Sequence, residues 1–191
     1  MKKVFFITFF IFFSFKVFSL EVTLTQGSVK PTPIAVTELY SKNSQLTKVG
    51  KNISTVISDN LERSGLFLPI DKRSFIQDNE SLANKPRFED WKLIKAQHLV
   101  SGKISSNNGK ISVEFRLYDV FQQKQIVGKK YETSEKNWRR VAHIISDSIF
   151  KNITGEGGYF DTRIVYVAET GPKENKQKRL AIMDQDQSNH R

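Results

Sequence analysis

The sequence predicts an α/β fold, in which a small mixed β-sheet is packed with helices and followed by the incomplete start of an all-β propeller. The first observation is the order of apolar patterns, which switch between the periods of a strand and a helix as β-α-β-α-β-β-β-α. The second is a glycine-rich hinge at 154–158, followed by two short β-type runs, 159–168 and 180–186. Two such runs are half of a four-stranded propeller blade. Because a lone hairpin is marginally stable in water, we expect the chain to be a fragment.

This reading divides the chain into four parts. Residues 1–20 are predicted to be a signal peptide, 21–153 an α/β domain, 154–158 the hinge, and 159–191 the first strands of a truncated propeller. We also expect residues 159–191 to exchange their amide hydrogens faster than the last predicted helix.

The leader is the most apolar part of the chain. Residues 4–15 follow two lysines and form an apolar stretch shorter than the roughly 20 residues that span a bilayer. We expect cleavage near residue 20 and export to the periplasm, with no integral span left afterwards. An uncleaved anchor is the alternative, because Val17 and Phe18 depart from the small-x-small pattern of cleavage sites.

Composition limits the function classes. The chain contains no cysteine, which excludes disulfides, thiol chemistry and lipid attachment at a cysteine. The formal net charge is +10, but the basic residues are spread along the chain and do not interleave with aromatics. A solvated, lysine-rich surface explains this better than nucleic-acid binding. A basic module for anionic lipid or nucleic acid remains as an alternative, and it predicts a steep salt dependence.

The first half of the mature chain predicts two strands, a helix and a third strand. Residues 21–26 alternate apolar and polar positions, and 34–39 form a second short strand after Pro31 and Pro33. A helix follows from about residue 47. Ser44 or Thr47 can cap its start, Gly65 suits its end, and its apolar stripe consists of Val49, Ile53, Val56, Ile57 and Leu61. Residues 66–70 are the next buried strand.

The second half predicts a helix, three strands and a final helix. A polar loop leads to a short helix around Phe88 and Trp91. Strands are expected at 98–105, 111–118 and 125–132, the first two joined by a type I′ turn at Asn108-Gly109. The last helix is expected at 135–152, with Ser134 as its N-cap and a core stripe of Trp138, Val141, Ala142, Ile145 and Ile149.

No pattern of catalytic residues stands out, and we predict neither an enzyme nor a cofactor. His98, His143 and His190 lack a triad-like context, and no metalloprotease, nucleophile-elbow or phosphate-loop motif occurs. His143 is expected to be a partly buried, hydrogen-bonded residue of the last helix. Asp184 and Asp186 have the opening spacing of a calcium loop, but a turn between propeller strands is the better interpretation.

The N-terminal segment is the candidate binding site. A free, alternating strand at a new N-terminus can pair with the edge of another protein's sheet. The alternative is that it forms an edge strand of its own domain. The candidate residues are Glu21, Val22, Thr23, Leu24, Thr25, Gln26, Gly27 and Ser28.

Several stretches along the chain form a recognisable series. They are the mature start at 21–27, the helix end Asp59-Asn60-Leu61 with Ser64-Gly65, the last-helix motif Ala142-His143 with Ser146-Asp147, the junction Thr154-Gly155 with Gly158, and the run Met183-Asp184. In this order the stretches resemble the TolB family of the Tol–Pal system. The resemblance implies a non-enzymatic periplasmic adaptor that links TolA to Pal and supports outer-membrane integrity and constriction during cell division. It assigns Glu21 through Ser28 to TolA and the propeller, mostly missing here, to Pal.

A competing interpretation is a fragment of a periplasmic, propeller-containing hydrolase that lacks its catalytic domain. A nucleophile elbow in sequence that follows residue 191 would favour the hydrolase, and repeated strand-rich blades would favour TolB.

Overall fold

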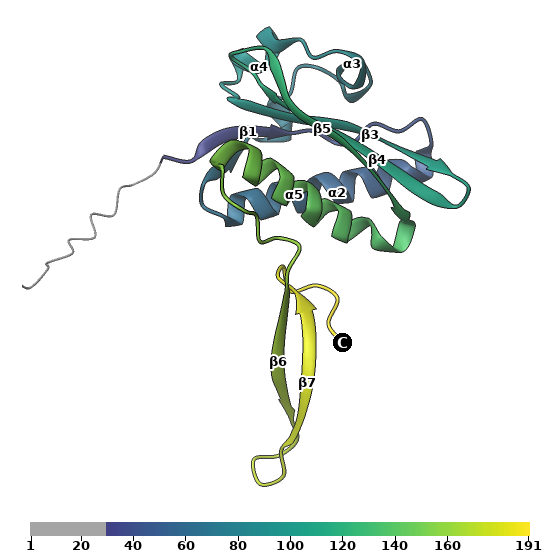
Figure 1. Cartoon of the computed structure of the whole chain (residues 1–191), viewed down its shortest axis with the longest axis vertical. Helices are drawn as coiled ribbons and strands as arrows, with labels where there is room; N and C mark the ends of the chain where they lie inside the picture. The colour runs from purple at the N-terminus through teal and green to yellow at the C-terminus, as the bar shows by residue number, and fades with distance from the viewer. Residues whose placement is uncertain (1–29) are drawn as a thin grey trace, which may run out of the picture.

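The computed structural model describes residues 30–191, and within them an α/β body carries a separate two-stranded hairpin (Figure 1). The predicted strand at 21–26 and the signal peptide lie outside the described residues. The strands of the body are β1 (Thr32–Val36), β2 (Phe67–Pro69), β3 (His98–Asn107), β4 (Lys110–Asp119) and β5 (Lys124–Ser134). Its helices are α2 (Ser44–Arg63), α3 (Asn79–Asn84), α4 (Phe88–Leu93) and α5 (Trp138–Thr154), with short 3-10 helices at Lys72–Ser74 and Glu135–Asn137.

The body contains one five-stranded mixed sheet in the order β2-β1-β3-β4-β5. β1 runs parallel to both of its neighbours, and β3, β4 and β5 form an antiparallel meander. The observed order of elements confirms the predicted α/β class, with a mixed sheet packed with helices.

Two layers of helices cover the sheet and divide its core. α2 and α5 pack side by side beneath one face, and α3 and α4 lie over one end of the other face (Figure 1). The larger core lies between the sheet and the α2–α5 pair, where β4 contributes Ile111, Val113, Phe115 and Leu117. A smaller core surrounds Trp91 of α4. The apolar face of β4 and the apolar stripes of α2 and α5 are therefore buried in this core, as the sequence predicted.

Several local details differ from the predictions. Asn43, rather than Ser44 or Thr47, caps α2 by accepting a hydrogen bond from the backbone N–H of Gln45. Ser134 precedes a 3-10 helix and makes no side-chain capping bond. The strand predicted at 34–39 begins and ends earlier, at Thr32–Val36.

Helix α3 was missed because the polar loop predicted there is partly helical. Asp78 caps it by accepting a bond of 2.9 Å from the N–H of Ser81, and only Leu82 and Ala83 are buried. Six residues with two apolar positions carry no readable helical period.

Positive φ angles are confirmed at the two places where the sequence predicted them. Gly65 follows α2 with φ of 73°, and Asn108-Gly109 joins β3 to β4 with φ of 49° and 74°. These are the left-handed values that a helix end and a type I′ hairpin require.

The hairpin projects away from the α/β body (Figure 1). It consists of β6 (Arg163–Thr170) and β7 (Gln177–Asp184), which pair antiparallel from Arg163 opposite Asp184 to Thr170 opposite Gln177. This two-stranded sheet is consistent with the start of a propeller. Its open end lies against α5 and α2, and at this junction several buried or partly buried polar side chains are hydrogen-bonded to one another.

Candidate functional site

Asn60 of α2 is the centre of the junction. Its side chain is fully buried and donates to Nδ1 of His143 at 2.9 Å and to Oγ of Ser146 at 3.0 Å, both on α5. Its Oδ1 accepts from Arg63 and, at 3.0 Å, from Nε2 of Gln185 in the turn that follows β7. An asparagine side chain offers two donor hydrogens and two acceptor positions, so Asn60 is completely satisfied. One residue therefore ties both long helices to the hairpin.

The hydrogen bonds of Asn60 also fix the state of His143. Since Asn60 uses its amide nitrogen as the donor, Nδ1 of His143 must accept, and the neutral ring carries its hydrogen on Nε2. Burial lowers the pKa of His143, while the carboxylates of Asp186 and Asp184 oppose this effect and Arg139 supports it. The buried histidine expected from the sequence is confirmed, and the structure adds that it is held neutral.

Arg139 and Asp186 form a second link between α5 and the turn. Nε and Nη2 of Arg139 lie 2.9 and 2.7 Å from Oδ2 of Asp186, whose side chain is only 6% exposed. Burial raises the pKa of this carboxyl, but the bonds from Arg139 and from the N–H of Ser188 outweigh it, so the pKa is lowered. Asp186 is therefore held as a carboxylate, and the interpretation of Asp184 to Ser188 as a turn is confirmed.

A third link anchors the chain between α5 and β6. Asp147 of α5 accepts from the N–H groups of Phe160 at 2.7 Å and Asp161 at 3.1 Å. A Cβ on Gly158 would come within 2.5 Å of Cα of Asp147, which explains glycine at this position. The ring of Phe160 is fully buried and meets that of Phe150 edge to face, with centroids 5.8 Å apart. A residue predicted to belong to the propeller start is thus part of the core of the α/β body.

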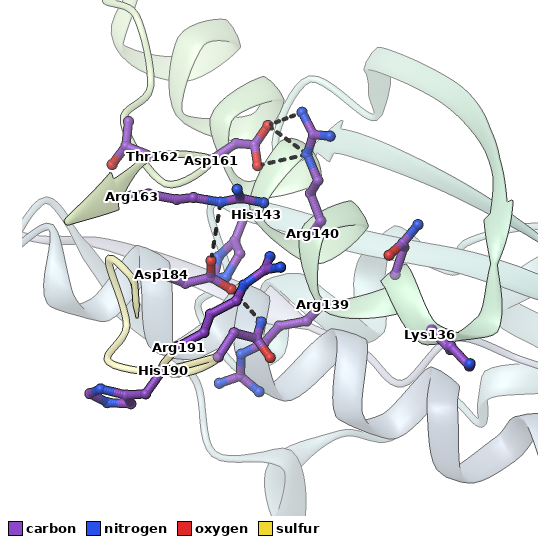
Figure 2. Close-up of a pocket in the computed structure, with 12 residues that line it drawn as sticks. Lys136, Arg139, Arg140, His143, Asp161, Thr162, Arg163, Asp184, His190 and Arg191 are labelled. Atoms are coloured by element: carbon purple, nitrogen blue, oxygen red, sulfur yellow. Dashed lines mark hydrogen bonds and ion pairs between the residues drawn. The ribbon is translucent and has the colours of Figure 1, made fainter. Parts of the chain in front are cut away.

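The carboxylates that lie near the N-terminal end of α5 belong to the linker before β6 and to the turn after β7. Its first turn contains no acidic residue, and no side chain caps it. Arg139 and Arg140 lie there instead, which is unfavourable beside the positive end of a helix dipole. Asp186 pairs with Arg139. Asp161 pairs with Arg140 at 3.2 Å (Figure 2). The hairpin and its linker therefore compensate a local charge that the helix alone leaves unbalanced.

The N-terminal end of α5 and the linker border a polar cavity of about 340 Å³ (Figure 2). Its wall combines Arg140, His143, Asp161, Arg163 and Asp184. Most of these charges are already paired with one another, including Arg163 with Asp184 at 3.8 Å.

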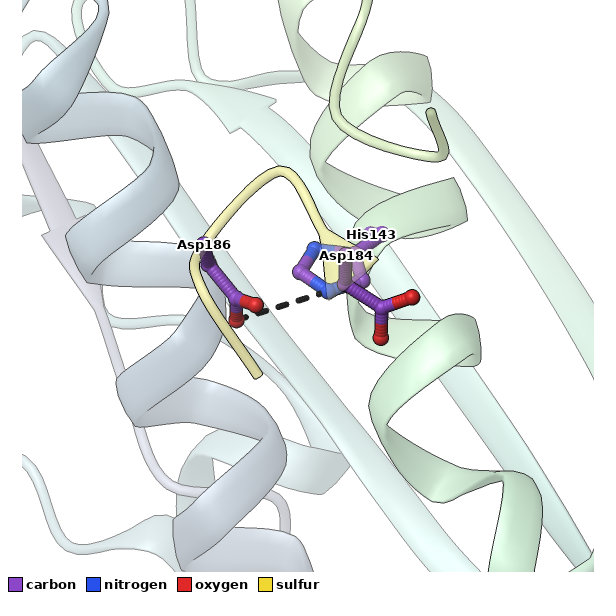
Figure 3. A group of neighbouring side chains, drawn as sticks. All are labelled: His143, Asp184 and Asp186. Carbon is purple, nitrogen blue, oxygen red and sulfur yellow. Dashed lines mark ion pairs between the residues drawn. The ribbon is translucent and has the colours of Figure 1, made fainter. Parts of the chain in front are cut away.

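His143, Asp184 and Asp186 resemble a metal-binding group, since their ligand atoms lie within 4.8 Å of one another (Figure 3). The hydrogen bonds argue against that role. A metal on Nε2 would place the hydrogen on Nδ1, where Asn60 already points a donor, whereas metal-bound histidines donate from the second nitrogen to an acceptor. Asp186 is also occupied by Arg139. The arrangement fits a structural contact.

The residues of a hydrolytic site are likewise not brought together. In the described part of the chain, no serine hydroxyl is hydrogen-bonded to a histidine; His143 contacts Asn60, and His190 contacts the Tyr166 hydroxyl at 2.9 Å. His98 begins β3, where burial lowers its pKa against the influence of Asp119. Residues 30–191 also include no helix that is both long and apolar enough to cross a membrane.

Sequence reasoning located some of these residues without their contacts. Asn60, His143 and Asp147 were identified as parts of motifs, but Gln185 lies 125 positions from Asn60, and no local signal connects them. The predicted partner-binding residues Glu21 through Ser28 lie outside the described residues, so their assignment stays a prediction.

Together the fold and the junction define an α/β domain that anchors a two-stranded hairpin. Among known families, a sequence model described as the TolB amino-terminal domain matches residues 20–126. The chain belongs to the TolB family.

Relatives from two bacteria support this assignment. The Tol-Pal system protein TolB of Paramagnetospirillum magneticum is 50% identical over 173 residues, which cover 90% of this chain and 39% of the relative. That of Pelagibacter ubique is 47% identical over 192 residues, covering 95% and 43%. The chain thus spans about two fifths of the length of these relatives.

A solved structure shows the same fold. TolB from Acinetobacter baumannii superposes with a TM-score of 0.71 at 24% identity, covering 84% of this chain and 38% of that one.

Proposed function

We propose that this chain supplies the N-terminal module of a non-enzymatic periplasmic adaptor that links TolA to Pal. The observation that carries the proposal is membership of the TolB family, over a match that begins at residue 20. In this proposal residues 21–28 bind TolA, and the β-module that begins at β6 contributes to binding Pal. The role in outer-membrane constriction during cell division, the cleaved leader and the periplasmic location belong to the same proposal.

In this proposal the α/β body also holds the β-module in a defined orientation, through the junction. Asn60, Asp147 and Asp186 each join a helix of the body to the linker or to the turn of the hairpin. Contacts of this kind hold a second module at a defined orientation, because buried, fully paired polar groups are costly to separate. A displacement in one module can then alter the other.

Deletion of residues 21–28 tests the TolA assignment. We expect the deletion to abolish binding to the C-terminal domain of TolA, measured by calorimetry, because an extended segment supplies both main-chain and side-chain contacts. A matched control replaces the exposed loop residues Lys173 and Glu174 by alanine and should bind normally. Unchanged affinity of the deletion variant would contradict the assignment.

A further inference from the structure

Beyond the proposed adaptor function, the structure points to a second protein-binding surface on the outer edge of β5. Within residues 30–191, β5 is the last strand of the five-stranded sheet, and no described strand pairs with its outer side. It is eleven residues long, and eight of these are exposed. The opposite edge is β2, which has three residues and ends in Pro69. Shortness and proline are common ways to close a sheet edge, so only β5 is left long and accessible in this sheet.

The accessible stretch is regular enough to accept another strand. From Val127 to Ser134, β5 pairs with β4 without interruption, from Leu117 opposite Val127 to Lys110 opposite Ser134. The ladder is irregular only before this stretch, next to Ile126. Alternate backbone N–H and C=O groups of an uninterrupted edge strand point outward and form the template for β-augmentation.

The charges on the strand indicate the chemistry of its partner. Lys129 and Lys130 are adjacent, exposed and directed to opposite faces of the sheet, and exposed Lys124 and Lys136 lie before and after them. Glu132 is the single acidic residue of the strand and lies 3.4 Å from Lys130. An extended segment with neighbouring acidic residues would place one carboxylate near each central lysine.

A second copy of this chain fits the same edge poorly. An antiparallel pair of two β5 strands centred on Lys129 would place the two Lys129 side chains opposite each other, and directly opposed like charges destabilise a sheet. Lysines on an edge strand are a known protection against such self-pairing. The same lysines attract a strand of opposite charge. We propose that β5 binds an extended acidic peptide segment of another protein by strand addition along residues 127–134.

A synthetic peptide tests this directly. The probe is a blocked eight-residue peptide of valine and threonine with two adjacent central glutamates, and its control has glutamines in their place. Titrated into the full chain at low salt, the glutamate peptide should slow exchange of the outward amides of residues 127–134 at least about tenfold and bind at least about tenfold more tightly than the control. No protection on β5, or equal affinity for both peptides, would overturn the proposal.

Charge variants locate the contact. The double change Lys129→Glu and Lys130→Glu should weaken binding at least about tenfold, and the milder pair Lys129→Gln and Lys130→Gln should weaken it less. The matched control reverses two exposed lysines of α2, Lys48→Glu and Lys51→Glu, and should stay within about twofold of the unmodified chain. An equal loss in the control would show general charge attraction and would refute a site on β5.

The last experiment measures the chain alone, without peptide. Sedimentation should show a monomer, and the outward amides of residues 127–134 should exchange freely before any peptide is added. Protection at this stage, either in a dimer or in a monomer that loses it when residues 21–28 are deleted, would show that this chain covers its own edge and would rule out the acidic partner.

Discussion

Strands β4 and β6 are both rich in β-branched and aromatic residues but have opposite surroundings. Apolar and polar residues alternate along most of β4, whereas β6 has an uninterrupted apolar and aromatic run from Ile164 to Ala168, yet six of the ten residues of β4 are buried and none of the eight in β6 is. β4 has a strand on each side and helices on its inner face, whereas β6 pairs only with β7. Val165 and Val167 of β6 are each 58% exposed. Burial of a strand therefore depends on the number of layers around it.

The comparison extends to how each region is stabilised. The α/β body has two apolar cores, one on each face of its sheet, while the hairpin is attached to the body at one end through Asn60, Asp147 and Asp186. Two-stranded hairpins are at best marginally stable in water. We therefore expect that the hairpin stays folded only because the junction holds it against the α/β body. Four experiments test this expectation.

The largest expected difference is in amide exchange. Amides in the middle of α5 should exchange at least about a thousand times more slowly than those near the far turn of the hairpin at 171–176, because the former open only with the whole body. Amides at 184–188, next to the junction, should be intermediate. Mass spectrometry of exchanged peptides measures this, and equal protection in α5 and the far turn would contradict a dependent hairpin.

Truncation of Phe160 should lower the stability of the chain more than any change in the exposed part of the hairpin. Phe160→Ala removes a fully buried ring that contacts Phe150, and the free energy of unfolding should fall by about 3–5 kcal/mol. Val165→Ala, in the exposed part of β6, should change it by less than about 0.5 kcal/mol. Urea unfolding followed by tryptophan fluorescence compares the two. Similar losses would mean that the hairpin and the body form a single core.

Removal of the Asn60 side chain should loosen the junction. Asn60→Ala leaves the buried Nδ1 of His143 and Oγ of Ser146 without their donor, which should cost about 2–3 kcal/mol and speed exchange at 184–188. Asn52→Ala, in the same helix at a partly exposed position, is the control and should cost less than about 0.5 kcal/mol. A loss of stability without faster exchange in the turn would show that Asn60 supports only the α2–α5 pair.

The smallest expected effect is a dependence of stability on pH. Because burial lowers the pKa of His143, the unfolded chain takes up its proton more readily. The stabilisation from His143 is therefore complete above its ordinary pKa of 6.5 and decreases as the pH falls below that value. Asp186, whose pKa is lowered, adds a further loss only when the pH falls below 3.8.

Thermal unfolding at pH 7.5 and 5.5 measures the histidine contribution. The unmodified chain should be less stable at pH 5.5, and His143→Gln should reduce this difference, leaving a remainder from His98, whose pKa is also lowered by burial. An unchanged difference in the variant would show that His143 is not held neutral by the junction.

Most of the body could be predicted because its signals are local and repeated. The stripe from Val49 to Leu61 and the alternation from Ile111 to Leu117 each contain enough periods to identify an element and its buried face. The short helix α3 was missed because it offers a single turn and two apolar residues. The cap of α2 was misplaced by one position or more, since Asn43, Ser44 and Thr47 all carry suitable side chains.

The junction could be predicted only in part. Glycine at 155 and 158 and aspartate at 184 and 186 predicted a linker and a turn, both of which need only local backbone geometry. The pairing of Asn60 with Gln185, or of Arg139 with Asp186, depends on how the hairpin meets the two helices. The sequence by itself determined the class of the fold, its elements and its TolB resemblance, because periodicity and motifs are properties of neighbouring residues. Only the tertiary structure decided that a buried asparagine, itself bonded to a neutral histidine, attaches the hairpin, because hydrogen bonds between distant segments exist only once the chain has folded.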